Sequence, residues 1–114
     1  MRAYELMIIV DADVDDAGQR QVLAKATELI EADGGRVATT DLWGRRRFAY
    51  EINKKHEGIY SVLQVVTPAT NLDALDRALR LADEVVRHKI LRLPDREAAK
   101  RGLLGEVASS AAAE

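Results

Sequence analysis

The feature that most constrains the fold of this chain is a long extended stretch from Arg36 to Val66. From Arg36 the side chains follow a period of two, which is typical of a β-strand. Residues 53–58 contain Asn and Gly and interrupt the stretch, so the sequence predicts a β-hairpin of two long strands. Gly44 inside the first of these strands indicates a bulge or a bend.

Before the hairpin, the sequence predicts a strand followed by a helix. Residues 4–10 form a short, β-rich apolar run, which is typical of a buried central strand. Alternate side chains would form one face of that strand: Tyr4, Leu6, Ile8 and Val10. Apolar residues then recur at helical spacing, with Asp13 or Asp15 as the N-cap and the Gly-Gly pair at 34–35 as the stop.

After Pro68, which ends the hairpin, a second helix and a last strand are predicted. Residues 70–73 resemble a capping box that opens the helix, and residues 85–93 form the strand. With right-handed crossovers, the order β-α-β-β-α-β predicts an α+β fold, the ferredoxin-like sandwich. Two helices would cover one face of a four-stranded antiparallel sheet. The other face would be free to bind a partner.

The 114 residues leave room for one compact domain and a tail. We expect the domain at residues 1–94. Residues 95–114 have too little bulky apolar content to hold themselves on a core, so we expect a flexible tail. Cys is absent, which excludes disulfides and thiolate sites. Without a leader or a membrane-spanning apolar run, the expected location is cytoplasmic, with no membrane partner.

The charges are distributed unevenly, although their net value is only −2. Residues 11–33 carry seven acidic and two basic side chains, whereas 36–60 and 84–101 each carry six basic and three acidic ones. An RNA partner responds to the local potential within about 10 Å. The sequence therefore predicts one acidic helix and two basic segments.

Groups able to perform catalysis do not converge in this sequence. His56 lies in a predicted turn, and His88 is better explained as a hydrogen-bonded sheet residue than as a base. The acidic run at 11–16 lacks the later Gly and Glu of a calcium loop, which favours its interpretation as a helix cap. The sequence thus predicts no enzyme, no cofactor, no metal site and no small-molecule substrate.

The triplet Arg45-Arg46-Arg47 is the strongest charge feature. Along a strand its side chains alternate between the two faces. Charges on an exposed strand also prevent aggregation, so the triplet alone fits edge protection and binding equally well. Four aromatic rings lie near the arginines: Trp43, Phe48, Tyr50 and Tyr60. This mixture favours contact with RNA or with a protein partner.

The hairpin segment WGRRRFAYEINKK at 43–55, followed by Gly58 and Tyr60, strongly resembles the bacterial small-subunit ribosomal protein six family. The family's pattern also matches YELMII at 4–9, the Gly-Gly pair at 34–35 and VRH at 86–88. The resemblance covers residues 1–93. It implies a structural constituent of the small (30S) ribosomal subunit that binds the central domain of 16S rRNA. The implied protein partner is small-subunit ribosomal protein eighteen, in a heterodimer.

The resemblance also implies site residues. The expected rRNA contacts lie beside the first strand, at the hairpin tip and on the last strand: Arg2, Lys54, Lys55, Arg87, Lys89 and Arg92. The expected partner interface follows the hairpin: Trp43, Arg45, Arg46, Arg47, Phe48, Tyr50 and Tyr60. Which hairpin cations meet RNA and which meet protein stays open. The acidic first helix would face away from the rRNA.

Two other classes of protein share this order of elements. An RNA-recognition-motif-like module for single strands needs stacking rings on its two central strands. The first strand offers Tyr4, but the last has Arg87, Lys89 and Leu91. An acylphosphatase-like hydrolase needs a basic loop that cradles phosphate, and the loop at 11–16 is acidic. Both alternatives are therefore disfavoured.

Overall fold

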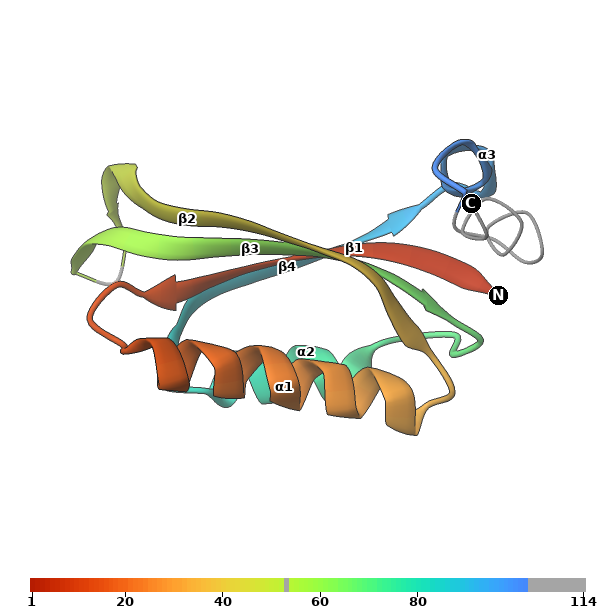
Figure 1. The fold of residues 1–114 in the computed structure, drawn as a ribbon, viewed down its shortest axis with the longest axis horizontal. Helices are drawn as coiled ribbons and strands as arrows, with labels where there is room; N and C mark the ends of the chain where they lie inside the picture. Colours follow the sequence, from red (N-terminus) through yellow and green to blue (C-terminus); the bar gives the residue numbers. More distant parts are fainter. Residues whose placement is uncertain (53, 103–114) are drawn as a thin grey trace.

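A computed structural model of the chain describes residues 1–52 and 54–102. Its elements in chain order are β1 (Arg2–Asp11), α1 (Asp16–Ala32), β2 (Arg36–Ile52), β3 (Lys55–Thr67), α2 (Asp73–Leu81), β4 (Val85–Leu93) and α3 (Asp95–Lys100). The four strands form one antiparallel sheet in the order β2-β3-β1-β4. Helices α1 and α2 cover one face of it (Figure 1), which confirms the ferredoxin-like α+β fold.

The core lies between the sheet and these two helices. As predicted, alternate side chains of the central strand β1 form its floor: Tyr4, Leu6, Ile8 and Val10. Helix α1 buries Val22, Ala26 and Ile30 against them, and α2 buries Leu75 and Leu79. Because this side of the sheet is filled by the core, the sheet can bind a partner only through its other face or its edges.

Of the two helix caps that the sequence predicts, the one before α1 is confirmed and the one before α2 is wrong. Asp15 caps α1, and its Oδ1 accepts a hydrogen bond from the Gly18 N–H at 2.8 Å. The predicted capping box before α2 does not form. The N-cap residue there is Leu72, which has no side-chain oxygen, and the Asn71 Oδ1 instead accepts from the Asp73 N–H at 3.1 Å.

The hairpin contains the predicted bulge but turns more tightly than the sequence indicates. Gly44 has φ +84°, and the pairing of β2 with β3 shifts between Leu42 and Gly44. The predicted loop at 53–58 is wrong in extent, because β3 already begins at Lys55 and pairs there with Ile52. Lys54 provides the left-handed backbone of the turn, with φ 64°, and Asn53 lies outside the described residues.

The flexibility of the tail expected from residue 95 stays a prediction, but the first six residues of that segment have regular structure. They form α3, whose Ala98 is fully buried against Ala3, Val66 and Leu93 on the face opposite α1 and α2. The contact is made by a small side chain, whereas the expectation of a tail rested on the lack of bulky apolar residues. The rest of the predicted tail, residues 103–114, lies outside the described residues.

Candidate macromolecular interface

The sheet face opposite α1 and α2 carries a groove with an apolar floor. Rows of paired residues cross this open face, with Arg87, Ile9 and Tyr60 in one row. The next row is Lys89, Met7 and Val62. Two cavities of about 330 and 310 Å³ follow these rows and share Met7 and Lys89 in their linings. The groove combines an apolar floor with cations along the β4 edge.

Three rings of the hairpin form a connected aromatic trio, Trp43, Phe48 and Tyr60, beside the groove. Trp43 and Tyr60 are parallel, with centroids 6.2 Å apart and planes 7° apart. Phe48 meets Tyr60 edge-on at 6.3 Å. Such offset and edge-to-face arrangements are the favourable ones for aromatic pairs. The trio is a preformed surface, because its rings hold one another in place.

The outer ring of the trio has polar neighbours that fix its orientation. Trp43 Nε1 donates a hydrogen bond to the Asp41 carboxylate at 3.0 Å. The Arg46 guanidinium lies 5.1 Å from the Trp43 ring centroid, within cation–π range. Trp43 nevertheless stays 44% exposed, and Tyr50 further along β2 is 69% exposed. The hairpin thus presents large rings to solvent beside fixed cations.

The arginine triplet divides between the two faces of the sheet. Arg45 pairs with Ile59 and Arg46 with Gly58, so the side chains of these two residues point to opposite sides, as predicted for them. Arg46 lies on the open face with the aromatic trio, and Arg47 lines the larger cavity. Arg45 is on the helix side, where its guanidinium donates to the Ala12 carbonyl at 3.3 Å. The structure therefore does not bring Arg45 together with the other partner-interface residues.

The predicted rRNA contacts are spread over the molecule. Arg87 and Lys89 are exposed at alternate positions of β4 and line the groove. Arg92 pairs with Tyr4, which places it on the other side of the sheet, and its guanidinium is 3.8 Å from Asp95. Only Arg87 and Lys89 of this set lie with the aromatic trio on the open face.

The remaining predicted contacts lie at the ends of the sheet. Arg2 is at the start of β1, and its Nη1 donates to the Thr70 carbonyl at 3.2 Å. Ile9, the partner of Arg87, is seven residues further along β1, roughly 23 Å at 3.3 Å per residue. Lys54 and Lys55 are at the hairpin tip, where Lys55 Nζ is 2.9 Å from Asp11 Oδ2. A surface using the whole set would have to span the length of the sheet.

Sequence reasoning missed the apolar floor of the groove. Its side chains come from the two inner strands, β1 and β3, and from the edge strand β4, which also carries the cations: Met7, Ile9, Val62 and Leu91. The signal was the apolar character of both faces of β1, since Met7 and Ile9 alternate with the core residues. Leu91 remains 45% exposed, so part of the floor is open to a partner.

Tyr4 and His88 both belong to the helix side of the sheet. Tyr4 is 6% exposed in the core, so it offers no stacking ring on the open face. His88 Nε2 lies 2.7 Å from Asp76 Oδ1, which confirms the prediction of a hydrogen-bonded sheet residue. This contact is the main cause that lowers the pKa of Asp76, with Arg80 adding to it. Within residues 1–52 and 54–102, no three potential metal ligands cluster.

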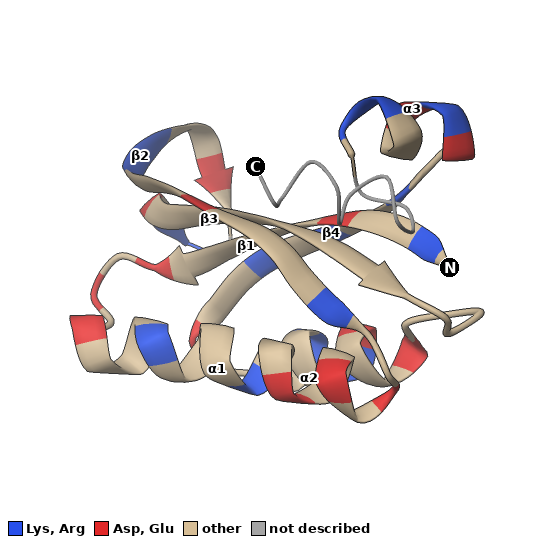
Figure 2. Ribbon diagram, turned by 45° about the vertical axis from the view of Figure 1, so that its right-hand side comes forward, with Lys and Arg blue, Asp and Glu red and all other residues tan. Residues whose placement is uncertain are grey.

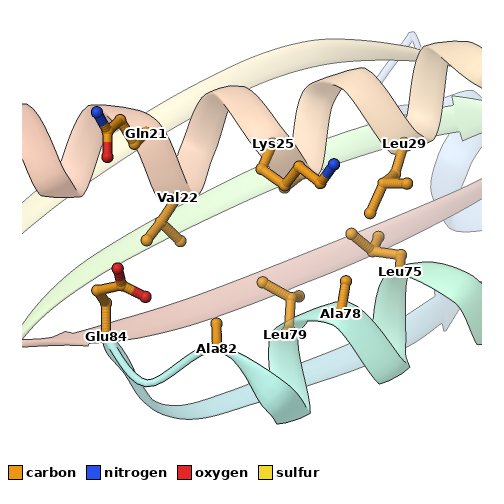
Figure 3. A pocket seen from close by; sticks show the side chains of 10 residues that line it. Gln21, Val22, Lys25, Leu29, Leu75, Ala78, Leu79, Ala82 and Glu84 are labelled. Carbon is orange, nitrogen blue, oxygen red and sulfur yellow. The ribbon is translucent and has the colours of Figure 1, made fainter.

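Helix α1 and the loops at its ends carry more acidic than basic residues, α2 carries both kinds, and most cations of the sheet lie on β2 and β4 (Figure 2). Between the two helices lies another cavity, of about 200 Å³ (Figure 3). Its walls are aliphatic side chains of both helices, with Lys25 and Glu84 at its rim. No helix in the part of the chain that the structure describes is long and apolar enough to cross a membrane.

The fold and the open face together define a ferredoxin-like α+β protein with a groove suited to macromolecular contact. Comparison with known proteins then gives the family. Residues 3–92 match the profile described as Ribosomal protein S6, and the chain belongs to that family. It is accordingly a protein of the small ribosomal subunit, located in the ribosome, and its family consists of structural ribosomal proteins rather than enzymes.

Curated relatives and solved structures agree with this assignment. The chain is 46% identical over 92 residues to small ribosomal subunit protein bS6 of Leifsonia xyli subsp. xyli, covering 81% of this chain and 72% of the relative. The bS6 protein of Corynebacterium aurimucosum is 47% identical, with coverage of 81% and 96%. The crystal structure of 30S ribosomal protein S6 from Thermotoga maritima superposes with a TM-score of 0.79 at 31% identity, covering 88% and 94%.

A more distant structure shares the fold alone. The P2 domain of chemotaxis kinase CheA from Thermotoga maritima, solved with the response regulator CheY, has a TM-score of 0.53 at 13% identity. It covers 81% of this chain and 98% of that domain. One fold thus serves different functions, so the fold alone does not define the function of this chain.

Proposed function

We propose that this chain binds the central domain of 16S rRNA as a heterodimer with small-subunit ribosomal protein eighteen, and that it has no enzymatic activity. The observation that carries the proposal is the open-face groove, where the aromatic trio lies next to Arg87 and Lys89. Rings and cations in one groove provide a surface for a protein partner beside a surface for phosphate. The working location would be the cytoplasmic ribosome.

The proposed rRNA surface centres on β4. Arg87 and Lys89 are exposed on the open face and have no acidic partner within hydrogen-bonding distance among the described residues. Arg2, Arg92 and Lys54 would extend the contact around the rim. Lys and Arg release counterions when they neutralise phosphates, and such contacts fix the orientation of a protein on RNA without reading its sequence.

The proposed partner surface is the open-face side of the hairpin. Trp43, Tyr50 and the Arg46 guanidinium are of the residue types that dominate binding free energy at protein interfaces. The apolar floor next to them would be covered by the partner. Residues 1–94 would form the binding domain, with α3 packed against it through Ala98.

The net charge of −2 implies that the chain alone binds RNA weakly. The test is therefore a salt titration of rRNA binding in the presence of protein eighteen. Four to six phosphate contacts give a log–log slope of about −3 to −5. A flat salt response, or nanomolar affinity without the partner, would contradict the proposal.

A further inference from the structure

The distal hairpin extends beyond the rest of the sheet. Strand β1 ends at Asp11, which pairs with Gly58, while β2 and β3 continue to Ile52 and Lys55 (Figure 1). Past Gly58 the two strands therefore have no third strand beside them. An isolated two-stranded ribbon is marginally stable and twists freely. Something else must set the orientation of the hairpin tip.

Arg45 connects this hairpin to the loop between β1 and α1. Its Nη2 donates to the Ala12 carbonyl at 3.3 Å, and its Nη1 donates to the Glu57 carboxylate on β3 at 3.4 Å. One guanidinium thus ties β2 to β3 and ties both to the loop. The planar fork of Arg suits such a double contact, which a Lys side chain cannot reproduce.

Lys55 makes a second connection to the same loop, from the other strand. Its Nζ lies 2.9 Å from Asp11 Oδ2, while Asp11 Oδ1 accepts from the Asp13 N–H at 3.0 Å. The Asp13 N–H and Lys55 together lower the pKa of Asp11, so the carboxylate stays ionised at neutral pH. Asp11 is held by the loop and in turn holds the hairpin.

We propose that Arg45 and Lys55 are positioning residues, which hold the hairpin tip in its docking orientation through Ala12 and Asp11. The family resemblance instead implies that Arg45 contacts the protein partner and that Lys55 contacts rRNA. The contacts to Ala12 and Asp11 occupy both cations within the chain and place Arg45 on the helix side, away from the aromatic trio. The inference rests on the proposed function, because docking is what the orientation serves.

The neighbouring residue Lys54 provides the natural contrast. It is exposed, it has no acidic partner within ion-pair distance among the described residues, and it differs from Lys55 by one position at the same tip. Lys54 can therefore reach a phosphate without giving up an internal contact. Lys55 would first have to leave Asp11.

Hydrogen exchange of the free chain tests the positioning without any partner. We expect Asp11→Asn and Lys55→Met each to speed amide exchange in residues 46–57 by about twofold to fivefold, as expected for loss of a partly exposed ion pair. The double variant should exchange no faster than either single variant, because both remove the same contact. Lys54→Met is the matched control and should leave exchange unchanged. Unchanged exchange in the Asp11 and Lys55 variants would overturn the inference.

The salt dependence of rRNA binding, measured with protein eighteen present, separates positioning from phosphate contact. We expect Lys55→Met and Asp11→Asn to weaken binding by the same factor and to leave the log–log slope unchanged. Lys54→Met should lower the magnitude of the log–log slope by about 0.7–0.9, as loss of one phosphate contact does. A reduced slope for Lys55→Met, with Asp11→Asn binding normally, would show that Lys55 contacts phosphate. If the unmodified chain shows no rRNA binding, the proposed function fails while the exchange result still stands.

Discussion

His88 Nε2 and Asp76 Oδ1 lie 2.7 Å apart and join β4 to α2 on the helix side of the sheet. The His88 side chain is only 11% exposed, so this contact is largely shielded from water. Arg80, one turn further along α2, pairs with the same carboxylate. Asp76 therefore anchors the shorter of the two covering helices to the edge strand that carries Arg87 and Lys89 on its other face.

The pair makes stability depend on pH in a defined direction. The pKa of Asp76 is lowered in the folded chain, chiefly by His88, so its contribution to stability is present above the ordinary Asp value of 3.8. That contribution is lost as the pH falls through the lowered folded value. We expect Asp76→Asn to lower Tm at pH 6–7, and the difference from the unmodified chain to shrink between about pH 4 and pH 2. Thermal unfolding followed by circular dichroism measures this.

The control for this variant is Asp83→Asn, which removes one exposed carboxylate just beyond α2. It should leave Tm nearly unchanged, since isolated surface charges contribute little. Equal losses for Asp76→Asn at pH 7 and pH 2 would show that the carboxylate's ionisation is not what stabilises the contact.

Trp43 is the expected centre of the partner interface. Trp43→Ala should weaken binding to protein eighteen by about 2 kcal/mol or more, because a buried interface Trp is a frequent hot spot. The change should affect folding less, since the ring is 44% exposed in the free chain. Leu42→Ala is the matched control, because Leu42 is 66% exposed and pairs with Ser61 on the helix side. Titration calorimetry that gives equal losses for both variants would argue against the open face.

Arg87 and Lys89 are expected to contribute through phosphate contacts. Arg87→Met should weaken rRNA binding and lower the magnitude of the log–log salt slope by about 0.7–0.9, and Arg87→Met with Lys89→Met should lower it by about twice as much. Arg77→Met on α2 should change neither quantity, because Arg77 belongs to the helical layer. Filter binding over a range of salt concentrations measures both. An equal decrease in the slope for Arg77→Met would mean that RNA contacts the helical layer as well as, or instead of, the open face.

Local patterns in the sequence were sufficient for the fold. Leu6 and Ile8 on one face of β1 and Met7 and Ile9 on the other are all apolar, and this pattern predicted that β1 is a central strand. Gly44 marked the bulge, because a positive φ is accessible to Gly at little cost. The hairpin loop was overestimated, since strand preference depends on context and a polar residue such as Glu57 can also pair in an exposed strand.

The site was harder to predict, because its contacts join distant parts of the chain. Arg45 and Ala12 are 33 positions apart, and no local period brings them together. The alternation of the triplet was predictable, but which face received Arg46 depended on the register shift at Gly44. The docking of α3 depended on a small residue, Ala98, that composition alone does not distinguish from its neighbours.

Helix α3 is expected to be a docked part of the domain. Ala98→Asp places a carboxylate in a fully buried position against Ala3 and Leu93, and we expect a loss of about 1–3 kcal/mol or detachment of the helix. Ala99→Asp, one residue further along, changes an exposed position and should be nearly neutral. Urea unfolding gives the free energies, and faster amide exchange of residues 96–101 reports detachment. Equal effects of the two substitutions would mean that the Ala98 contact is not maintained.

The cavity between α1 and α2 gives a stability prediction that is independent of binding. Ala78 lies in its wall, on the side of α2 that faces α1, in a cavity of about 200 Å³ (Figure 3). Ala78→Leu keeps a strong helix former and adds aliphatic surface against Val22 and Leu29, so we expect a gain of about 0.5–1 kcal/mol. Binding to rRNA and to protein eighteen should be unchanged, because the cavity lies on the side of the sheet opposite the groove. Ala74→Leu, at an exposed position of the same helix, is the control and should leave urea unfolding nearly unchanged. A loss of stability for Ala78→Leu would show that the two helices are already packed too closely there to accept a larger side chain.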